Sequence, residues 1–140
     1  MMTIVFEVPG DPKGKGRPRF ARMGTFTKVY TDKQTLNYEE HIALMAKKAI
    51  GASDPLKRPV IVCLYVRLPI PKSYPKSRAK ACLEGLERPC KKPDIDNIAK
   101  SYLDAMNGII FLDDIQVVEL NVKKVYSAVS GVDVLVMESE

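Results

Sequence analysis

The chain begins with an alternation of polar and apolar residues that is typical of a half-buried β-strand. Between residues 3 and 8, Ile4, Phe6 and Val8 occupy every second position, so one face of an extended segment would be apolar. Residues 59–68 are almost continuously apolar and rich in β-branched side chains. Such a run predicts a buried central strand.

Two apolar runs near the end of the chain, residues 115–126 and 132–137, also have the length and composition of strands. The connection between them, residues 127–131, is short and ends in glycine. A short connection that contains glycine is typical of a hairpin. The sequence therefore predicts that these two strands pair directly.

Helical periodicity predicts three helices. The first covers residues 32–50, because the sequence Thr31-Asp32-Lys33-Gln34 has the pattern of a capping box and Gly51 provides a stop. A short basic helix is predicted over residues 76–85, and a third helix over residues 98–106. The apolar positions of the first helix are Leu36, Ile42, Ala43, Met45, Ala46 and Ile50.

The order strand-helix-strand-helix-helix-strand-strand indicates an α/β fold of the α+β kind, with one mixed β-sheet and helices packed on it. A length of 140 residues suits a single domain over residues 1–140 with one core. Cys63 falls in the predicted central strand and is expected in that core.

The segment between residues 9 and 24 is rich in glycine, proline and positive charge, and no acidic residue occurs between Pro12 and Thr31. Its cations, with Phe20 and Phe26 nearby, fit a loop that grips a phosphate backbone and places an aromatic ring against bases. The alternative is a solvated loop whose phenylalanines anchor it to the core. The candidate DNA-binding cations are Lys13, Lys15, Arg17, Arg19 and Arg22 here, and Lys72, Lys76, Arg78, Lys91 and Lys92 farther along.

Two aspartates two residues apart, Asp94 and Asp96, are the strongest candidates for chemistry. Pro93 disfavours helical backbone in the residue before it, so the chain is expected to enter Asp94 extended. Residues two apart in an extended segment share a face, which would bring both carboxylates together and turn Ile95 toward the core. If a helix begins near Asp96, Lys100 lies four residues on along the same helical stripe.

A second acidic pair, Asp113-Asp114, precedes the predicted strand at residues 115–126. Neighbouring residues of an extended segment face opposite ways, so only one of the two is expected to enter a site. We expect the carboxylates to meet at the rim of the sheet, between the helix after Asp96 and the strand after Asp114. An Asp-Asp pair between apolar runs is also an ordinary turn signal.

Carboxylates gathered in this way repel one another unless a cation or a proton lies between them. Mg²⁺ prefers carboxylate oxygens and leaves coordination sites for water and phosphate, and it can generate a hydroxide nucleophile beside a phosphodiester. Lys100 would hold the attacking water or offset negative charge. The structural alternative is that Asp94 caps a turn, Asp96 caps the helix, and Lys100 pairs with Asp96 or Asp104.

Three motifs follow one another at compatible spacing: Pro93-Asp94-Ile95-Asp96-Asn97-Ile98-Ala99-Lys100, Leu103-Asp104-Ala105-Met106-Asn107-Gly108 and Asp113-Asp114-Ile115-Gln116-Val117. Through these motifs the chain resembles the RusA family of Holliday junction resolvases. The basic segment from Pro12 to Arg19 is similar to the phage and prophage branch of that family.

The resemblance implies a homodimeric endonuclease that uses Mg²⁺, or Mn²⁺ in its place, to nick opposed strands of a four-way DNA junction. It implies metal binding and catalysis by Asp94, Asp96 and Asp114, assistance from Lys100, and Asp113 as a further candidate ligand. Two other classes stay open. A different metal-dependent nuclease would act on flaps or plain duplex with the same residues, and a binding module would recognise branched DNA without cutting it.

The composition narrows the remaining classes. Hydrophobic residues make up 46% and charged residues 28% of the chain, as in an ordinary globular protein, and the net charge of +5 favours an anionic partner. Three cysteines and one histidine match no paired zinc spacing, which argues against a structural zinc site and a histidine general base. The chain has no apolar run of bilayer length, and residues 1–8 lack the features of a signal peptide. We therefore expect a cytoplasmic protein with no membrane partner and no organic cofactor.

Overall fold

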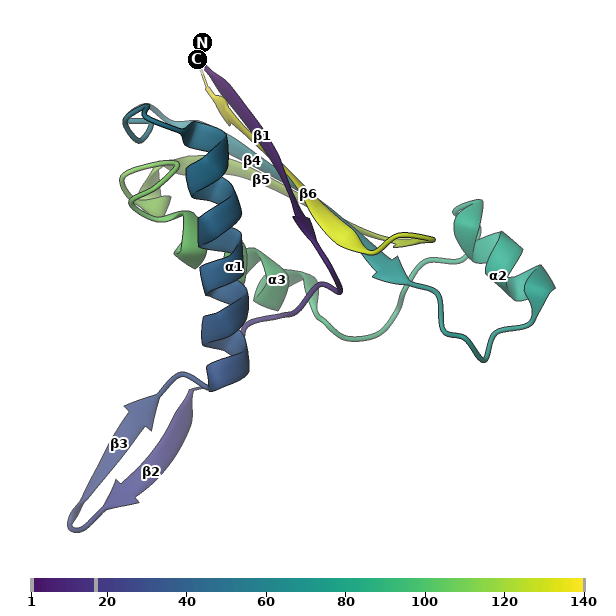
Figure 1. The fold of residues 1–140 in the computed structure, drawn as a ribbon, viewed down its shortest axis with the longest axis horizontal. Helices are drawn as coiled ribbons and strands as arrows, with labels where there is room; N and C mark the ends of the chain where they lie inside the picture. The colour runs from purple at the N-terminus through teal and green to yellow at the C-terminus, as the bar shows by residue number, and fades with distance from the viewer. Residues whose placement is uncertain (1, 17, 140) are drawn as a thin grey trace.

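A computed structural model describes residues 2–16 and 18–139, and its centre is a four-stranded mixed sheet (Figure 1). The strand order is β1 (Thr3–Pro9), β6 (Gly131–Glu138), β4 (Val60–Pro69) and β5 (Val117–Ser127). Strand β6 is antiparallel to both β1 and β4, whereas β4 and β5 are parallel. The predicted α+β class with a mixed sheet is confirmed.

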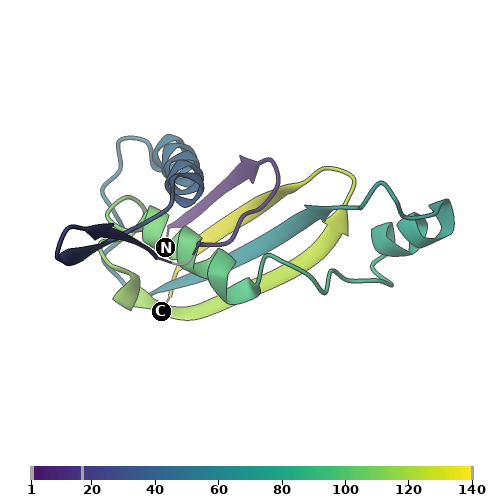
Figure 2. The same cartoon turned by 90° about the horizontal axis from the view of Figure 1, so that it is seen from below.

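Helices α1 (Lys33–Ile50) and α3 (Ile95–Met106) pack on one face of this sheet, and α2 (Lys76–Leu83) stands beyond its end (Figures 1 and 2). The strands present every second side chain to these helices, as the alternating pattern predicts. Their buried apolar residues are Ile4, Phe6 and Val8 of β1, Val60, Val62, Leu64, Val66 and Leu68 of β4, Tyr126 of β5, and Val132, Val134 and Val136 of β6.

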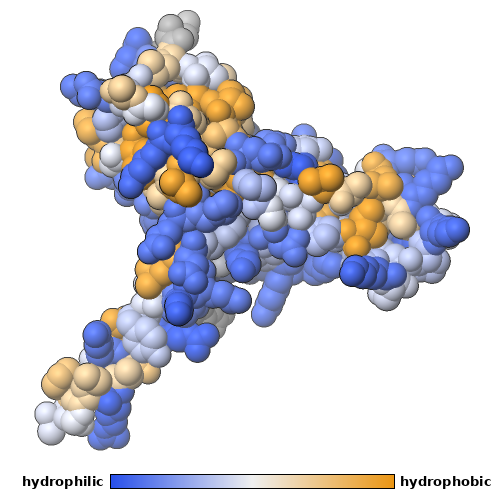
Figure 3. All heavy atoms as spheres, in the orientation of Figure 1, coloured by the Kyte–Doolittle hydropathy of each residue, from blue (hydrophilic) through white to orange (hydrophobic). Residues whose placement is uncertain are grey.

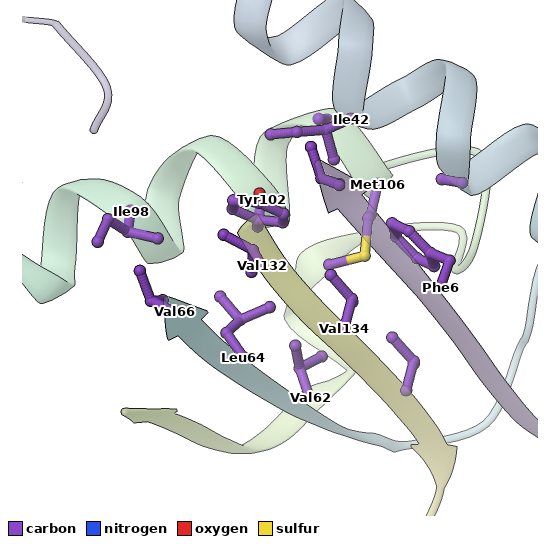
Figure 4. Close-up of a cluster of buried hydrophobic side chains, with 14 of the residues drawn as sticks. Phe6, Ile42, Val62, Leu64, Val66, Ile98, Tyr102, Met106, Val132 and Val134 are labelled. Atoms are coloured by element: carbon purple, nitrogen blue, oxygen red, sulfur yellow. The ribbon is translucent and has the colours of Figure 1, made fainter. Parts of the chain in front are cut away.

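The core lies between the sheet and the two helices (Figure 4). Ile42 of α1 and Ile98 and Tyr102 of α3 are fully buried there. The hydroxyl of Tyr102 lies 2.6 Å from that of Tyr38, so each of these two buried hydroxyl groups has a partner. Tyr38 is therefore a packing residue, and the single core agrees with the prediction of one domain.

The predicted hairpin between the last two strands is wrong, because β4 lies between β5 and β6 in the sheet. Adjacent strands are about 4.8 Å apart, so the short connection after Ser127 is long enough to pass the end of β4 and skip one position. The prediction used only the length of the connection and its glycine. The parallel β4–β5 pair requires a long crossover, and the segment containing α2 and α3 provides it.

The sequence analysis did not predict the hairpin that the structure contains. Strands β2 (Arg19–Met23) and β3 (Phe26–Tyr30) pair only with each other in a separate two-stranded sheet. Gly24 has φ of 63° at the two-residue turn, which a type II′ turn requires at its first central position. No residue of either strand is buried, so the sequence contains no alternation of buried and exposed positions that would reveal the pair.

Three smaller expectations also need correction. The N-cap of α1 is Asp32, whose side chain accepts a 2.7 Å hydrogen bond from Thr35 N, so the capping box predicted from Thr31 is absent. Leu36, expected in the apolar stripe, is 46% exposed. Cys63 is half-buried on the sheet face away from the helices, and Cys82 is the buried cysteine.

No helix within residues 2–16 and 18–139 is both long and apolar enough to cross a membrane.

Candidate active site

Helix α3 begins at Ile95, with Asp94 as its N-cap. The expectation of an extended segment through Asp96 is therefore wrong: Asp96 lies in the first helical turn, and Ile95 is 45% exposed instead of packing in the core. Pro93 fixes its own backbone and restricts the residue before it, but not the residues that follow. It leaves Asp94 free to cap a helix and the next residue free to begin one.

The charged side chains in the first turns of α3, those of Asp94, Asp96 and Lys100, are exposed and unpaired in the described structure. Aspartate is a preferred N-cap type, yet the Asp94 carboxylate makes no capping hydrogen bond. Within the described part of the chain, neither Asp94, Asp96 nor Lys100 forms an ion pair or a side-chain hydrogen bond. The structural alternative, in which these groups cap and pair with one another, is therefore not what the structure contains.

The backbone before Asp94 is held in place by a lysine of β5. Lys124 Nζ donates hydrogen bonds to Lys91 O at 2.7 Å and to Pro93 O at 3.1 Å, next to a cis Lys92–Pro93 peptide bond. Sequence reasoning missed Lys124. The available signal was a lysine in phase with the core-facing residues of a predicted strand, where a charged side chain requires a polar partner.

A short glycine-containing strap, Gly14–Gly16, joins the beginnings of the two core helices. Lys15 N donates to Asn97 O of α3 at 3.0 Å, and Gly16 N donates to Thr35 Oγ1 of α1 at 2.9 Å. A Cβ atom on Gly14 would lie 2.9 Å from Asn97 Cβ, and one on Gly16 would collide with Asp32. Both glycines are therefore required by close approach of the strap to the helices.

The ammonium group of Lys15 is paired with two carboxylates of the protein itself. Its Nζ lies 2.9 Å from Glu39 Oε1 and 2.7 Å from Asp104 Oδ2, and its side chain is only 20% exposed. Burial alone would lower the pKa of Lys15, but hydrogen bonds and charge from Asp104 and Glu39 outweigh burial and raise it above its ordinary value. Although Lys15 was predicted to bind DNA, the structure places it as a clamp between α1 and α3.

A cavity of about 810 Å³ opens between the strap, the beginning of α1 and residues 92–97. Lys13, Lys92 and Asp94 line it, so it combines positive charge with a free carboxylate. Three cations predicted to bind DNA, Lys13, Lys15 and Lys92, therefore line the same cavity as Asp94, and of these Lys15 is already paired with Glu39 and Asp104.

The other predicted DNA-binding cations are distributed more widely. Arg22, Lys72 and Lys76 are exposed. Arg19 Nε lies 3.9 Å from Asp32 Oδ2, at the base of the β2–β3 hairpin. Arg78 is bound to Glu87 and lies 3.7 Å from the ring centroid of Tyr74, and Lys91 lies over the ring of Tyr126 at 5.6 Å. Arg17 lies outside the described residues.

Asp113 and Asp114 do not enter a strand directly. Asp114 begins a single 3₁₀ turn, η1 (Asp114–Gln116), and Asp113 is its N-cap. The Asp113 side chain accepts from Ile115 N at 3.2 Å, while Gln116 Oε1 accepts from Asp113 N at 2.9 Å. Asp113 thus has a structural role as the cap of η1.

The pKa of Asp114 is raised above its ordinary value. The causes, in order, are a side-chain hydrogen bond with Asp113, partial burial, and the negative charges of Asp113 and Asp104. The structure therefore brings Asp114 close to Asp104 in the second half of α3. The expected meeting of Asp114 with Asp94 and Asp96 at the start of that helix is not seen.

Across residues 2–16 and 18–139, no three His, Cys, Asp or Glu side chains lie close enough together to share one metal ion. The donor chemistry nonetheless fits Mg²⁺, because the free groups are carboxylates and one of them, Asp94, is not used for capping. Mg²⁺ is commonly held by one or two carboxylates together with substrate phosphate and water. A preformed cage of three protein ligands is therefore not a requirement.

A family model described as "Endodeoxyribonuclease RusA" matches residues 9–137. The chain is also 35% identical over 140 residues to a protein of Bacillus subtilis (strain 168) named "Uncharacterized protein YqaN". That alignment covers 99% of this chain and 98% of the B. subtilis protein. The family match includes the strap, all of α3 and the Asp113-Asp114 pair.

Proposed function

The chain belongs to the RusA endodeoxyribonuclease family, and on this premise we propose that it resolves four-way DNA junctions by Mg²⁺-dependent hydrolysis of two opposed phosphodiester bonds. The observation that carries the proposal is the exposed beginning of α3. Asp94, Asp96 and Lys100 lie there without side-chain partners in the described chain, and Asp94 lines a cavity together with the cations Lys13 and Lys92 and the carboxylate of Asp32.

Each element of this site has a role toward a phosphodiester. Lys13 and Lys92 attract the DNA backbone into the cavity. The first amide groups of α3 have no intrahelical acceptor and no cap from Asp94, so they offer donors to a phosphate oxygen. Lys124 fixes the backbone that leads into Asp94 and so fixes the position of its carboxylate.

In the proposed reaction a water oxygen bonds to phosphorus and releases a proton to solvent, the bond from phosphorus to one bridging oxygen breaks, and that oxygen takes up a proton as it leaves. Negative charge increases on the phosphoryl oxygens during this exchange. Lys100 lies one helical turn beyond Asp96 and would offset that charge. The Asp94 and Asp96 carboxylates would orient the attacking water through its hydrogens.

In the described structure Asp94, Asp96 and Asp114 do not form one cluster. We propose that they come together to hold Mg²⁺, or Mn²⁺ in its place, only when the substrate phosphate is bound. When bound, the metal ion lowers the pKa of coordinated water and neutralises charge on the phosphate. Asp113 is a weaker candidate ligand because its carboxylate already caps η1.

Two symmetric cuts require two copies of this site. We therefore propose a homodimer with a two-fold axis, in which each protomer cleaves one strand. The expected partner is branched DNA, in keeping with the net charge of +5.

The test compares cleavage of a labelled four-way junction with an immobile core and of a linear duplex of the same sequence, with Mg²⁺ and with a chelator. We expect paired symmetric nicks in the junction only, lost with the chelator and lost in Asp96→Asn. Equal cutting of junction and duplex would instead identify a nuclease of another specificity. Tight junction binding with no nick at any Mg²⁺ concentration would identify a binding module.

A further inference from the structure

The β2–β3 hairpin is an apolar surface that covers no core. Phe20 is 69%, Met23 48% and Phe26 63% exposed. Figures 1 and 3 show the hairpin standing clear of the body, in a direction away from α2. Large side chains exposed together in this way mark an interaction surface more often than an accident of packing.

The strand register separates the hairpin into two faces. Opposed residues share a face, so the pairs Met23–Phe26 and Ala21–Lys28 lie on one side and Phe20–Val29 and Arg22–Thr27 on the other. Met23 and Phe26 are the last pair before the turn at Gly24. The hairpin therefore ends in an exposed aromatic and thioether pair, with a cation farther back on each face.

The charge of this segment selects the partner. No acidic residue occurs between Pro12 and Thr31, while Arg19, Arg22 and Lys28 alternate with the apolar side chains. A surface that binds another protein can include carboxylates. A surface that binds nucleic acid avoids them, because they would repel the phosphate backbone.

Phenylalanine further restricts what the hairpin can recognise. It has no hydrogen-bond donor or acceptor, so it cannot read base edges in a groove. It can stack on the face of a base. Base faces are covered by their neighbours in continuous duplex and become accessible where the stack is interrupted, as at a branch point.

The base of the hairpin leads directly to the candidate active site. The strap that precedes β2 contacts α3 at Asn97, and Asp32, just after β3, lines the same cavity as Asp94. A strand of five residues at about 3.3 Å per residue reaches roughly 15 Å. DNA whose phosphate occupies the cavity would therefore lie within reach of the hairpin tip.

We propose that the tip of the β2–β3 hairpin, Phe26 with Met23, stacks on unpaired or unstacked bases at a DNA branch point while Arg19, Arg22 and Lys28 hold the flanking phosphates. This proposal rests on the proposed function, because it names the feature of branched DNA that the same protein recognises. It assigns to the hairpin the distinction between a junction and plain duplex, which the carboxylates do not make.

The test uses a four-way junction and a matched duplex, each with 2-aminopurine in place of one adenine, next to the branch point in the junction. All fluorescence measurements contain a chelator, which removes Mg²⁺ and so prevents cleavage. Wild-type protein is expected to raise the fluorescence of the junction probe, since unstacking relieves quenching, and to leave the duplex probe unchanged. Phe26→Ala is expected to abolish this rise and to weaken junction binding about tenfold, within the range for loss of one stacked base.

Three further variants make the result specific. Phe26→Tyr keeps a ring and is expected to restore the signal. Arg22→Gln is expected to weaken junction and duplex binding equally. The slope of the logarithm of affinity against the logarithm of salt concentration should fall by about one. Leu86→Ala removes an even more exposed apolar side chain (79%) near α2 and is expected to change nothing.

Cleavage of the unmodified junction by wild-type protein is measured in parallel. If wild-type protein cuts the junction but Phe26→Ala keeps full affinity and fluorescence, the stacking proposal is overturned and the proposed function stands. If the fluorescence depends on Phe26 but nothing is cut, the proposed function fails and base stacking stands. If Phe26→Ala changes only the molar mass in solution, the tip is an interface between copies of the chain, which also overturns the proposal.

Discussion

Asp113 and Asp114 are adjacent in the chain, but their carboxylates have opposite effects on stability. Asp113 caps η1. The pKa of Asp114 is raised by a side-chain hydrogen bond with Asp113, then by partial burial, and then by the negative charges of Asp113 and Asp104. Without metal the ionised Asp114 therefore destabilises the fold. Asp114→Asn is expected to raise the melting temperature in chelator, while cleavage in Mg²⁺ falls by roughly a hundredfold or more.

The gain in melting temperature expected for Asp114→Asn depends on pH in a definite direction. A raised pKa means that the folded chain binds the proton more tightly than the unfolded chain, so stability is lost as pH rises through the folded pKa of Asp114. The difference in melting temperature between Asp114→Asn and wild type should be largest above that pKa. It should vanish at pH values below the ordinary range of an aspartate, where both side chains are neutral. A difference independent of pH would contradict this account.

Asp113→Asn is the matched control. Asparagine is also a good N-cap, so η1 should stay intact and most of the cleavage should remain. If Asp113→Asn loses as much activity as Asp114→Asn, Asp113 takes part in the reaction and the division of roles between the two carboxylates is wrong.

At this scale the sequence identifies the types of chemical group but not their partners. Asp94, Asp96 and Lys100 were identified from their spacing. Only the structure shows that these side chains form no ion pair with other described residues. Lys15 was expected to contact DNA because it lies in a basic segment, yet its partners are 24 and 89 positions away in the chain. No local pattern reports such contacts.

At the scale of elements, Lys124 connects β5 to the segment that leads into α3. Its two hydrogen bonds fix the carbonyls of Lys91 and Pro93, and a bond from a charged donor contributes about 1.5–3 kcal/mol. Lys124→Met is expected to lower kcat about tenfold with little change in KM or junction affinity, because the Asp94 carboxylate loses its fixed position. Lys124→Arg should restore part of the activity.

Lys123→Met provides the comparison for this variant. Lys123 is the neighbouring residue of β5 and faces the opposite side of the sheet, where it is exposed. We expect Lys123→Met to retain wild-type kcat. An equal loss in both variants, or a loss in KM alone for Lys124→Met, would show that Lys124 acts on DNA binding and not on the position of Asp94.

The elements that bury a regular apolar face were predictable, and the others were not. Strand β1 and helix α1 lie close to their predicted bounds because each buries a periodic set of side chains. The β2–β3 hairpin buries none, so its pattern is hidden. The neighbours of β5 and β6 depend on β4, about 60 residues earlier, and strand pairing over that distance has no local signal.

At the scale of the whole molecule, the proposed dimer makes a prediction about mixed protomers. On a supercoiled plasmid that extrudes a cruciform, a dimer with two active sites should cut both strands in one encounter and yield linear DNA. Preincubation with excess Asp96→Asn protein should produce dimers with one active site, and these should release nicked circles instead.

The measurement is the ratio of nicked to linear product as the fraction of Asp96→Asn increases, with light scattering to verify a mass near twice 15.6 kDa. A Leu86→Ala protein in place of Asp96→Asn should leave the ratio unchanged. If excess Asp96→Asn slows the reaction but linear DNA stays the main product, the two cuts are not made by two protomers of one exchanging dimer.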